Sequence, residues 1–461
     1  MSGRTCVIRR ILIANRGEIA VRVIRTCERL GIETVLAASA ADMDSVPARR
    51  ADHVICIGPA KSSSSYLNVD AVIAAGLGAR ADAIHPGYGF LSENAKMAHA
   101  CEAAGLVFIG PTEAQLAAVG DKLTARRLAV AAGLPVVPGG EARTPHEAHV
   151  LASHIGFPLL IKAVGGGGGR GMKQVHAARQ LDETMDMAIA EAQAAFGDPR
   201  VYLERYIAAG RHIEVQVLGD GEEVVHLGTR DCSIQRRYQK LLEEAPAPNL
   251  SESLREAMHG AAVAFARRLR YRGLGTVEFL MDCERETFYF LEMNARIQVE
   301  HPVTEEICGL DLVEEQIAVA EGRKLRVSQA GVKFSGAAIE CRINAENWTQ
   351  DFRPSPGAVT RACFAVGEGI RVDTHMQSGA KIPPYYDSLI AKLIAHGKDR
   401  PAALARLADA LVRTEISGID STLRMHRELV RQAPLQRGGV TTAYFEEFLK
   451  SRAAIDAGGV R

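Results

Sequence analysis

Short apolar stretches alternate with amphipathic ones over the first part of the chain, a pattern typical of strands and helices in turn. Residues 18–30 have their apolar positions at helical spacing, and Gly31 follows where a left-handed residue commonly ends a helix. Strands are expected at residues 10–15, 34–38, 81–85 and 106–109. Because strands that alternate with helices form a parallel sheet covered by helices, this order predicts a doubly wound α/β domain.

Beyond that domain, prolines and changes of pattern divide the chain further. A helix over residues 120–132 is expected to end at Gly133, and Pro135 and Pro138 mark a linker. Two blocks follow, at about residues 139–205 and 212–325. The C-terminal segment contains an apolar stretch at residues 334–342, a proline-rich loop at residues 353–356 and a final helix near residues 402–412.

A glycine run, residues 165–169, lies between apolar strands expected at residues 158–164 and 171–175. A hairpin loop of this kind exposes backbone N–H groups that can surround phosphate oxygens, and Lys162 beside it can add a positive charge. No Gly-Lys-Ser/Thr follows, which excludes a Walker loop, and the protein kinase motifs His-Arg-Asp and Asp-Phe-Gly are missing. The first βα turn also lacks the glycine pattern of a dinucleotide site. We therefore expect a nucleotide-binding lid of another kind.

Polar and apolar residues alternate strictly over residues 292–300, which predicts a strand with one polar face. Upstream, residues 275–280 form another strand, and a turn over residues 283–287 would place Glu278 directly opposite Glu292. Facing carboxylates repel each other, so the pair requires a cation, and oxygen ligands of this kind suit Mg²⁺.

The length of this polar stretch limits how it can fold. Extended chain from Glu292 to Glu300 would span about 26 Å at about 3.3 Å per residue, farther than one small substrate reaches. If all five polar side chains serve one site, the strand must end near Asn294 and the chain must fold back. The polar positions are Glu292, Asn294, Arg296, Gln298 and Glu300.

Charge and cysteine content narrow the class of protein. The 55 Lys and Arg residues balance 55 Asp and Glu residues, which argues against a protein that binds nucleic acid or an anionic membrane. The nine cysteines are scattered without C-x-x-C spacing, so neither a zinc site nor a disulfide framework is expected. No apolar stretch approaches the ~20 residues of a membrane helix, and the N-terminus lacks a secretory signal. These features favour a cytoplasmic protein.

Seven segments resemble biotin carboxylase, and they occur in the family's order over residues 10–446. They are residues 13–20, 85–93, 165–172, 230–240, 243–246, 292–304 and 340–346. The resemblance implies an ATP-grasp fold of mixed α/β and α+β class. Its parts would be an N-terminal Rossmann-like domain (1–120), an ATP-grasp domain (121–325) with a mobile glycine-rich lid at about 139–205, and a C-terminal biotin carboxylase domain (331–446).

The resemblance also implies roles for individual residues. Those expected to contact ATP are Lys122, Lys162, Gly168, Gly169, Met172, Glu204, Arg205, Tyr206, Ile207, His212, Gln235 and Tyr238. The metal, Mg²⁺ or Mn²⁺, would be held by Glu278, Glu292 and Asn294. Bicarbonate would contact Lys240, Arg296, Gln298 and Val299, with Glu300 as the base, and biotin would contact Arg342 with Tyr88 nearby. The catalytic residues implied are Lys240, Arg296, Glu300 and Arg342.

The activity implied is carboxylation of the biotin of a biotin carboxyl carrier protein, with bicarbonate and ATP and through carboxyphosphate. This is the first half-reaction of a biotin-dependent carboxylase, such as the acetyl-CoA carboxylase of fatty acid biosynthesis. Since no carboxyltransferase region and no biotinylation segment follows, a separate carboxyltransferase subunit is expected. A homodimer is also expected, because the family often dimerises.

Two other functions remain alternatives. One is another ATP-grasp carboxylate ligase, such as a carbamoyl-phosphate type of enzyme, although the segment around Arg342 and the single ATP-grasp unit argue against it. The other is a non-catalytic ATP-binding regulatory subunit. Such a protein would be expected to lack some of Lys240, Glu278, Glu292, Arg296 and Glu300, and all five are present.

Position 238 departs from the family's pattern. The family commonly has His there, in contact with the nucleotide sugar, whereas this chain has Tyr238. A phenol can still donate or accept one hydrogen bond. We therefore expect Tyr238 to keep the sugar contact through its hydroxyl.

Overall fold

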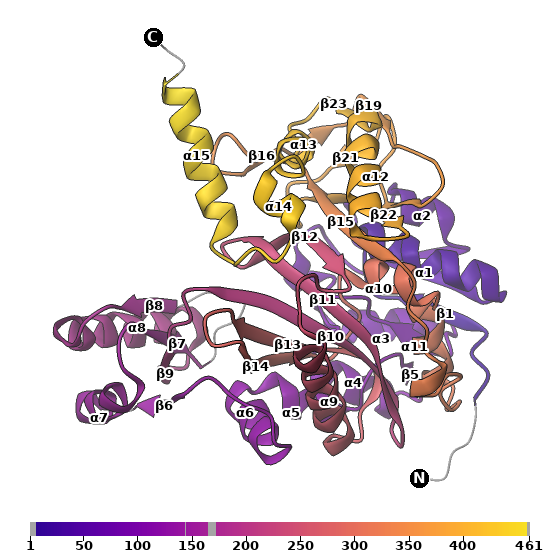
Figure 1. The fold of residues 1–461 in the computed structure, drawn as a ribbon. Helices are drawn as coiled ribbons and strands as arrows, with labels where there is room; N and C mark the ends of the chain where they lie inside the picture. The colour runs from indigo at the N-terminus through magenta and orange to yellow at the C-terminus, as the bar shows by residue number, and fades with distance from the viewer. Residues whose placement is uncertain (1–5, 143, 165–171, 459–461) are drawn as a thin grey trace.

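The computed structural model describes residues 6–142, 144–164 and 172–458 (Figure 1). The N-terminal part contains a parallel sheet in the order β3-β2-β1-β4-β5, which is the order of a doubly wound sheet. Its strands are β1 (Arg10–Ile13), β2 (Glu33–Ala38), β3 (His53–Cys56), β4 (Ala83–His85) and β5 (Val107–Phe108). The helices of this part are α1 (Gly17–Leu30), α2 (Val46–Arg50), α3 (Val69–Gly78), α4 (Ala95–Ala103) and α5 (Glu113–Gly120), with a 3-10 turn η1 (Ser62–Ser64). Gly31 ends α1 with φ 68°, as predicted.

The helix predicted over residues 120–132 is in fact two helices, so that prediction was wrong at its start. Helix α5 ends at Gly120, and α6 (Lys122–Ala131) begins one residue after Asp121. Asp121 is extended, with φ −91° and ψ 112°, and its side chain accepts a hydrogen bond from the Thr124 amide. An aspartate in this position caps a new helix, and it fixes Lys122 as the first residue of α6.

A separate antiparallel sheet in the order β6-β9-β7-β8 forms a lobe that extends away from the body of the molecule (Figure 1). Its elements are β6 (Gly139–Ala142), α7 (Pro145–Ile155), β7 (Leu159–Ala163), β8 (Met172–Val175), η2 (Ala178–Gln180), α8 (Leu181–Phe196) and β9 (Val201–Arg205). The lobe has its own apolar core, which includes Leu159, Ile161, Val175 and Leu203. The lobe spans the residue range in which the lid is predicted, and its role as a mobile lid stays a prediction. Gly168 and Gly169 lie outside the described residues.

An eight-stranded antiparallel sheet, in the order β14-β13-β10-β11-β12-β15-β22-β20, runs through the body. Its strands are β10 (Gly210–Asp220), β11 (Val224–Arg236), β12 (Gln239–Ala245), β13 (Arg272–Asp282), β14 (Thr287–Asn294), β15 (Ala337–Asn344), β20 (Ile370–Thr374) and β22 (Leu389–Gly397). The helices around it are α9 (Glu252–Arg268), α10 (His301–Cys308), α11 (Leu312–Ala320) and α12 (Arg400–Arg413), with η3 (Gln329–Gly331).

The hairpin of β13 and β14 brings Glu278 opposite Glu292 as predicted, but the predicted turn over residues 283–287 was one residue too long. Thr287 belongs to β14 and pairs with Asp282, and a bulge between Glu278 and Phe279 shifts the register by one residue and restores the pairing of the two glutamates. Glu278 pairs with Glu292 across the two strands, and the connecting turn lies between Asp282 and Thr287. Strand β14 ends at Asn294, as the length argument required, and the chain turns before α10 begins at His301. The polar residues that follow Asn294 therefore lie close to those before it.

The C-terminal segment contains more than the sequence predicted. The helix expected near residues 402–412 is α12, but it is not the final one. The remaining elements are β16 (Glu346–Asn347), β17 (Arg353–Pro354), β18 (Gly357–Ala358), β19 (Arg361–Cys363), β21 (Lys381–Ile382), β23 (Glu415–Ser417), α13 (Leu423–Leu429), α14 (Ala433–Arg437) and α15 (Tyr444–Gly458). Helices α13 and α14 are too short for an apolar period to stand out, so tertiary packing decides them. None of the described helices combines the length and the apolar character that crossing a bilayer requires.

Candidate active site

A row of charged side chains crosses four neighbouring strands of the eight-stranded sheet. Glu292 on β14 pairs with Glu278 on β13, Glu278 pairs with Glu214 on β10, and Glu214 pairs with Arg230 on β11. Strand β10 directs its polar residues to this face because polar and apolar positions alternate along it, while Ile213, Val215 and Val217 enter the core. The row is the base of the candidate site.

Lys240 on β12 joins this row to the turn before α10. Its ammonium group donates to Glu278 at 2.9 Å, to Glu300 at 2.8 Å and to Glu214. Burial alone would lower the pKa of Lys240, but the three carboxylates outweigh it and raise the pKa well above its ordinary value. Lys240 is therefore a fixed positive charge held between three anions.

The carboxylates around Lys240 are ionised for the same reason. Burial would raise the pKa of Glu278, but Lys240 and His212 lower it well below the ordinary range. For Glu300, the effect of burial is outweighed by Lys240 and Arg342, and the pKa is lowered. An ionised Glu300 in a buried place can accept a proton.

His212 is the second cation beside Glu278. Its Nε2 lies 3.0 Å from a Glu278 oxygen and 3.3 Å from a Glu214 oxygen. Burial would lower the pKa of His212, but Glu278 and Glu214 raise it to about 10. The histidine is therefore protonated at neutral pH and presents an N–H group at the edge of the charged row.

Glu278 and Glu292 fit a divalent cation. Burial and the charge of Glu278 raise the pKa of Glu292, although Lys122 and Lys240 lower it in part. A cation bound between Glu278 and Glu292 would offset the repulsion of the two carboxylates. Asn294 donates to Glu278 at 2.7 Å, which leaves its side chain beside the pair. Two carboxylates and an amide oxygen are the donors that Mg²⁺ prefers.

Two more lysines lie on the side of the charged row that faces the lobe, one on the body and one on the lobe itself. Lys122 begins α6, close enough to Glu292 for that carboxylate to raise its pKa, although burial dominates and lowers it. Lys162 on β7 forms an ion pair with Glu204 on β9. The lysines from the body and the lobe therefore face the same space, where phosphate groups could lie between them.

Four of the predicted ATP contacts lie at the end of β9 and directly after it: Glu204, Arg205, Tyr206 and Ile207. Arg205 and Tyr206 use their backbone N–H groups to bond the carbonyl oxygens of Pro138 and Pro158, and Ile207 is buried. Met172 begins β8 on the lobe, and Gln235 lies buried near the end of β11. Tyr238 lies in the β11–β12 turn with φ 68°, and 53% of its surface is exposed.

Two arginines are held by carboxylates that sequence reasoning did not single out. Arg296 donates to Glu93 at 2.8 Å, and Glu93 also accepts the Ala295 amide. Arg230, fully buried, donates to Glu214 and to Gln298, while Gln298 donates to Glu278 at 2.8 Å. Gln298 is thus fixed between Arg230 and the metal-ligand candidates.

Arg342 on β15 joins Glu300 from the other side. Its Nη2 donates to Glu300 at 2.8 Å, and its Nε donates to Glu243 of β12. Glu300 therefore accepts from Lys240 with one oxygen and from Arg342 with the other. Glu300 therefore connects Lys240, which is predicted to contact bicarbonate, with Arg342, which is predicted to contact biotin.

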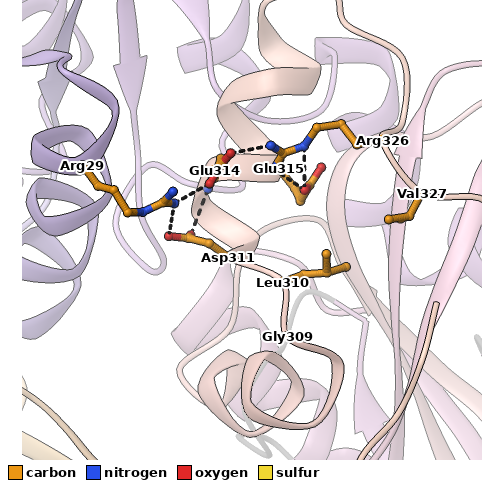
Figure 2. A pocket seen from close by; sticks show the side chains of 8 residues that line it. All are labelled: Arg29, Gly309, Leu310, Asp311, Glu314, Glu315, Arg326 and Val327. Atoms are coloured by element: carbon orange, nitrogen blue, oxygen red, sulfur yellow. Dashed lines mark hydrogen bonds and ion pairs between the residues drawn. The ribbon is translucent and has the colours of Figure 1, made fainter. Parts of the chain in front are cut away.

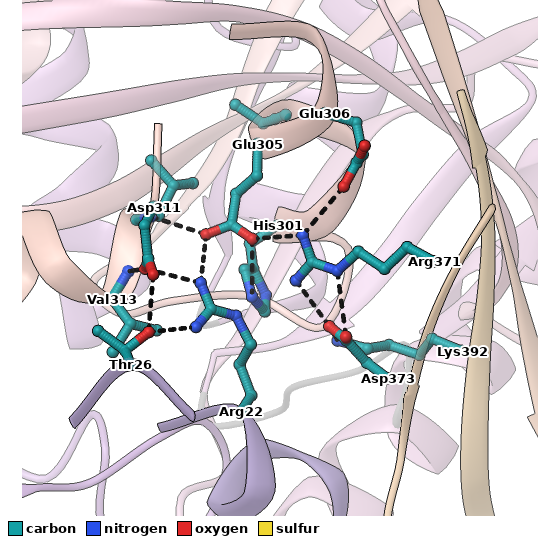
Figure 3. A network of polar contacts seen from close by, with 12 residues as sticks. Arg22, Thr26, His301, Glu305, Glu306, Asp311, Val313, Arg371, Asp373 and Lys392 are labelled. Carbon is teal, nitrogen blue, oxygen red and sulfur yellow. Dashed lines mark hydrogen bonds and ion pairs between the residues drawn. The ribbon is translucent and has the colours of Figure 1, made fainter. Parts of the chain in front are cut away.

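The surroundings of Tyr88 and Val299 are set by a buried lysine. Tyr88 donates its hydroxyl to Glu18 of α1, and Glu18 lies 3.1 Å from the ammonium of Lys392. Lys392 also donates to the carbonyl oxygen of Val299 at 2.8 Å. Figure 3 shows that Lys392 lies beside Asp373, at the end of a polar network that continues through Arg371.

The structure brings most of the predicted residues to one region between the body and the lobe. Sequence reasoning missed Glu93, Glu214, Arg230, Glu243 and Lys392 as members of the site. The alternation His212, Glu214, Gln216 is a signal that could have identified Glu214. Arg230 lies in a segment that carries the family resemblance, but full burial of an arginine is not visible in a sequence.

Two surface pockets lie elsewhere. Figure 2 shows the first, where Arg29 contacts Asp311 and Glu314, and Arg326 contacts Glu314 and Glu315. The second, beside it, is lined by Arg22, Arg25, Glu305, Glu306, Gly309, Leu310, Asp311 and Arg371. Among the described residues that line them, none belongs to the predicted site.

Three family models match the chain almost from end to end. The biotin carboxylase N-terminal domain matches residues 7–116, the carbamoyl-phosphate synthase L chain ATP binding domain residues 121–328, and the biotin carboxylase C-terminal domain residues 340–447. The biotin carboxylase of Nostoc sp. is 49% identical over 444 residues, which cover 96% of this chain and 99% of the relative. Biotin carboxylase 1 of Bacillus subtilis is 48% identical over 445 residues, with 96% and 99% covered.

Solved structures give the same result. A biotin carboxylase of Campylobacter jejuni in complex with β,γ-ATP has a TM-score of 0.92 and 44% identity, and the match covers 96% of this chain and 99% of that one. The biotin carboxylase domain dimer of the 2-oxoglutarate carboxylase of Hydrogenobacter thermophilus, in complex with MgADP, ADP and bicarbonate, has a TM-score of 0.91 and 44% identity. That match covers 96% of this chain and 98% of that one.

Proposed function

The chain belongs to the biotin carboxylase family, and from this premise we propose that it uses ATP and bicarbonate to carboxylate biotin. Its fold is the ATP-grasp fold of biotin carboxylases. The observation that carries the proposal is the position of Glu300, which accepts from Lys240 with one oxygen and from Arg342 with the other. The bicarbonate and biotin ends of the reaction would meet at this carboxylate.

In the proposed reaction, Glu300 removes the proton of bicarbonate, and a bicarbonate oxygen attacks the γ-phosphorus of ATP. Carboxyphosphate and ADP result. Lys240 and Arg296 would hold the bicarbonate, with Gln298 and the Val299 backbone beside them, and the planar guanidinium of Arg296 is suited to a flat anion. The cations that lower the pKa of Glu300 make it a weaker base, but they also acidify the bound bicarbonate.

Phosphoryl transfer requires positioning and neutralised charge rather than covalent help from the protein. Lys122 and Lys162 would contact the phosphates, together with Gly168, Gly169 and Met172 of the lid, while Glu204, Arg205, Tyr206 and Ile207 would hold the base. His212, Gln235 and Tyr238 would lie near the sugar. Glu278, Glu292 and Asn294 would hold Mg²⁺ or Mn²⁺, which when bound neutralises phosphate charge.

The second step transfers the carboxyl group to biotin. Carboxyphosphate breaks down to CO₂ and phosphate, the phosphate removes the ureido proton of biotin, and the ureido nitrogen attacks CO₂. Arg342 would stabilise the negative charge on the ureido oxygen, in the manner of an oxyanion hole. Tyr88, fixed by Glu18, would lie at the edge of the biotin site.

The partners belong to the same proposal. We infer that the biotin is attached to a biotin carboxyl carrier protein, that a separate subunit carries the carboxyltransferase, and that the chain forms a homodimer in the cytoplasm. The similar biotin carboxylase domain dimer of Hydrogenobacter thermophilus supports the inference of a homodimer. The full complex would carboxylate an acyl-CoA or a keto acid, with acetyl-CoA carboxylase of fatty acid biosynthesis as one example.

The proposal is tested by the cleavage of ATP with each substrate left out in turn. We expect ATP cleavage to require bicarbonate and Mg²⁺, and free biotin to stimulate it. ATP cleavage that proceeds equally well without bicarbonate would contradict the proposal. ATP cleavage that requires a different carboxylate would favour another ATP-grasp ligase, and no ATP cleavage under any condition would favour the non-catalytic alternative.

A further inference from the structure

Two buried glutamates lie near Arg342, and one of them accepts a hydrogen bond from it. Glu243 on β12 and Glu340 on β15 are paired in register on neighbouring antiparallel strands, so their side chains lie on the same face of the sheet. Both are fully buried. Nothing in the proposed reaction uses either of them.

Most oxygens of this pair lack a partner. Glu243 accepts from Arg342 Nε with one oxygen, but its other oxygen and both oxygens of Glu340 have no hydrogen-bond partner among the described residues. Two ionised carboxylates so close together in an apolar layer would repel each other without compensation.

No cation forms an ion pair with Glu340 among the described residues, although the charges of Lys392 and Arg342 lower its pKa in part. Lys392 from β22 is engaged by Glu18 of α1 and by the Val299 carbonyl, and Arg342 by Glu243 and Glu300. His301 of α10 is neutral, since burial and nearby cations hold its pKa well below the usual range. Lys392 and Arg342 are therefore both engaged by other acceptors.

We propose that Glu243 and Glu340 share one proton and act as a dyad that positions Arg342 for biotin. The proton lies between the free oxygen of Glu243 and a carboxyl oxygen of Glu340, so the dyad carries one negative charge. Burial, with the neighbouring carboxylate as a smaller contribution, raises the pKa of Glu340 well above its ordinary value, and burial raises that of Glu243 to about 7. Both directions agree with a pair that retains a proton at neutral pH.

The dyad would matter for one half of the reaction. Glu243 with a single charge holds the Nε edge of Arg342 and leaves the rest of the guanidinium available to Glu300 and to the ureido oxygen. Loss of the shared proton at alkaline pH would add a second negative charge beside Arg342 and draw it away from biotin. The inference rests on the proposed contact of Arg342 with biotin, and both glutamates are positioning residues.

The test is the ratio of biotin carboxylation to bicarbonate-dependent ATP cleavage, measured from about pH 6 to about pH 10 with free biotin. In the wild type we expect the ratio to fall roughly fivefold or more toward alkaline pH. Glu340→Gln retains the shape of the side chain and an N–H donor toward Glu243 but has no proton to lose. Its ratio should stay nearly constant over the same range.

Glu244→Gln is the matched control. Glu244 is the next residue of β12, is also buried, and is paired with Arg400 on the opposite face. This variant should keep the alkaline fall of the wild type. A Glu340→Gln profile that coincides with those of the wild type and the control would overturn the dyad.

Glu243→Gln provides a second, independent measurement. Arg342 loses its charged Nε partner, so the KM for free biotin should rise roughly tenfold, with the KM for ATP unchanged. An unchanged KM for biotin would also overturn the proposal. If the wild type did not carboxylate biotin at any pH, the proposed function would be wrong. That outcome is distinct from failure of the dyad, in which the wild type carboxylates biotin but the variants behave as it does.

Discussion

At the scale of single residues, the site is organised by charges that hold each other in place. Lys240 contacts three carboxylates, and Arg296 and Arg342 each have a carboxylate partner in Glu93 and Glu243. Because these groups are fixed before any substrate arrives, little reorganisation is needed when phosphate or carboxylate charge develops.

The opposed carboxylates of the β13–β14 hairpin give the first prediction. Glu278→Gln or Glu292→Gln removes one negative charge from the metal-ligand candidates, so Mg²⁺–ATP turnover should fall roughly 100-fold or more. Folding should be affected little, because glutamine has nearly the same shape. Turnover at limiting Mg²⁺ is the measurement, and wild-type rates in both variants would be inconsistent with a metal at this pair.

Arg342 and Lys240 should separate the two half-reactions. Arg342→Ser removes the proposed contact to the ureido oxygen, so it should abolish biotin carboxylation and retain some bicarbonate-dependent ATP cleavage. Lys240→Gln removes the cation at the centre of Glu214, Glu278 and Glu300 and should reduce both activities. Normal carboxylation of biotin by the Arg342 variant would show that its assignment is wrong.

Tyr238 is exposed enough to reach a ligand at the β11–β12 turn. If its hydroxyl contacts the sugar, Tyr238→Phe removes one neutral hydrogen bond worth about 0.5–1.5 kcal/mol and weakens ATP affinity roughly 2- to 10-fold. The loss should appear in the KM for ATP, since a sugar contact is the same in the ground and transition states. Tyr289→Phe, on β14, serves as the control, and an equal KM in the two variants would mean that Tyr238 points away from the nucleotide.

At the scale of elements, the pairing of Glu278 with Glu292 in the β13–β14 hairpin could be predicted because its signal is local. Alternation along both strands indicated the facing glutamates, and the span of an extended chain required the strand to end near Asn294. The bulge between Glu278 and Phe279, which offsets a turn one residue shorter than predicted, left no signal in the sequence. The break between α5 and α6 was missed because one capping residue, Asp121, decides it within a continuous helical pattern. The partners of Arg230 and Arg296 come from distant segments, which no local pattern reveals.

The start of α6 gives a prediction at this scale. Asp121→Ala removes the cap that fixes Lys122, so it should cost about 0.5–2 kcal/mol of stability and raise the KM for ATP. Ser251→Ala removes the cap of α9, which carries no predicted site residue. The two variants should lose similar stability in thermal unfolding, but only Asp121→Ala should change the KM. A rise of the KM for ATP in both variants would show that lower stability alone, and not the position of Lys122, weakens ATP binding.

At the scale of the whole molecule, the proposed reaction would take place between the body and the four-stranded lobe. The lysines that face it come from both parts, Lys122 from the body and Lys162 from the lobe (Figure 1). Family resemblance could predict the order of the parts, whereas the division at residues 120, 325 and 331 stays a prediction. Individual side-chain roles also stay predictions, because they depend on bound substrates.

Biotin carboxylation is tested most directly by following the carbon of bicarbonate. The protein is incubated with labelled bicarbonate, ATP, Mg²⁺ and free biotin, and the label on biotin is compared with the phosphate released. We predict that label appears on biotin only when ATP is present, and that Arg342→Ser releases phosphate without labelling biotin. Phosphate release by the wild type with no label on biotin would contradict the central claim.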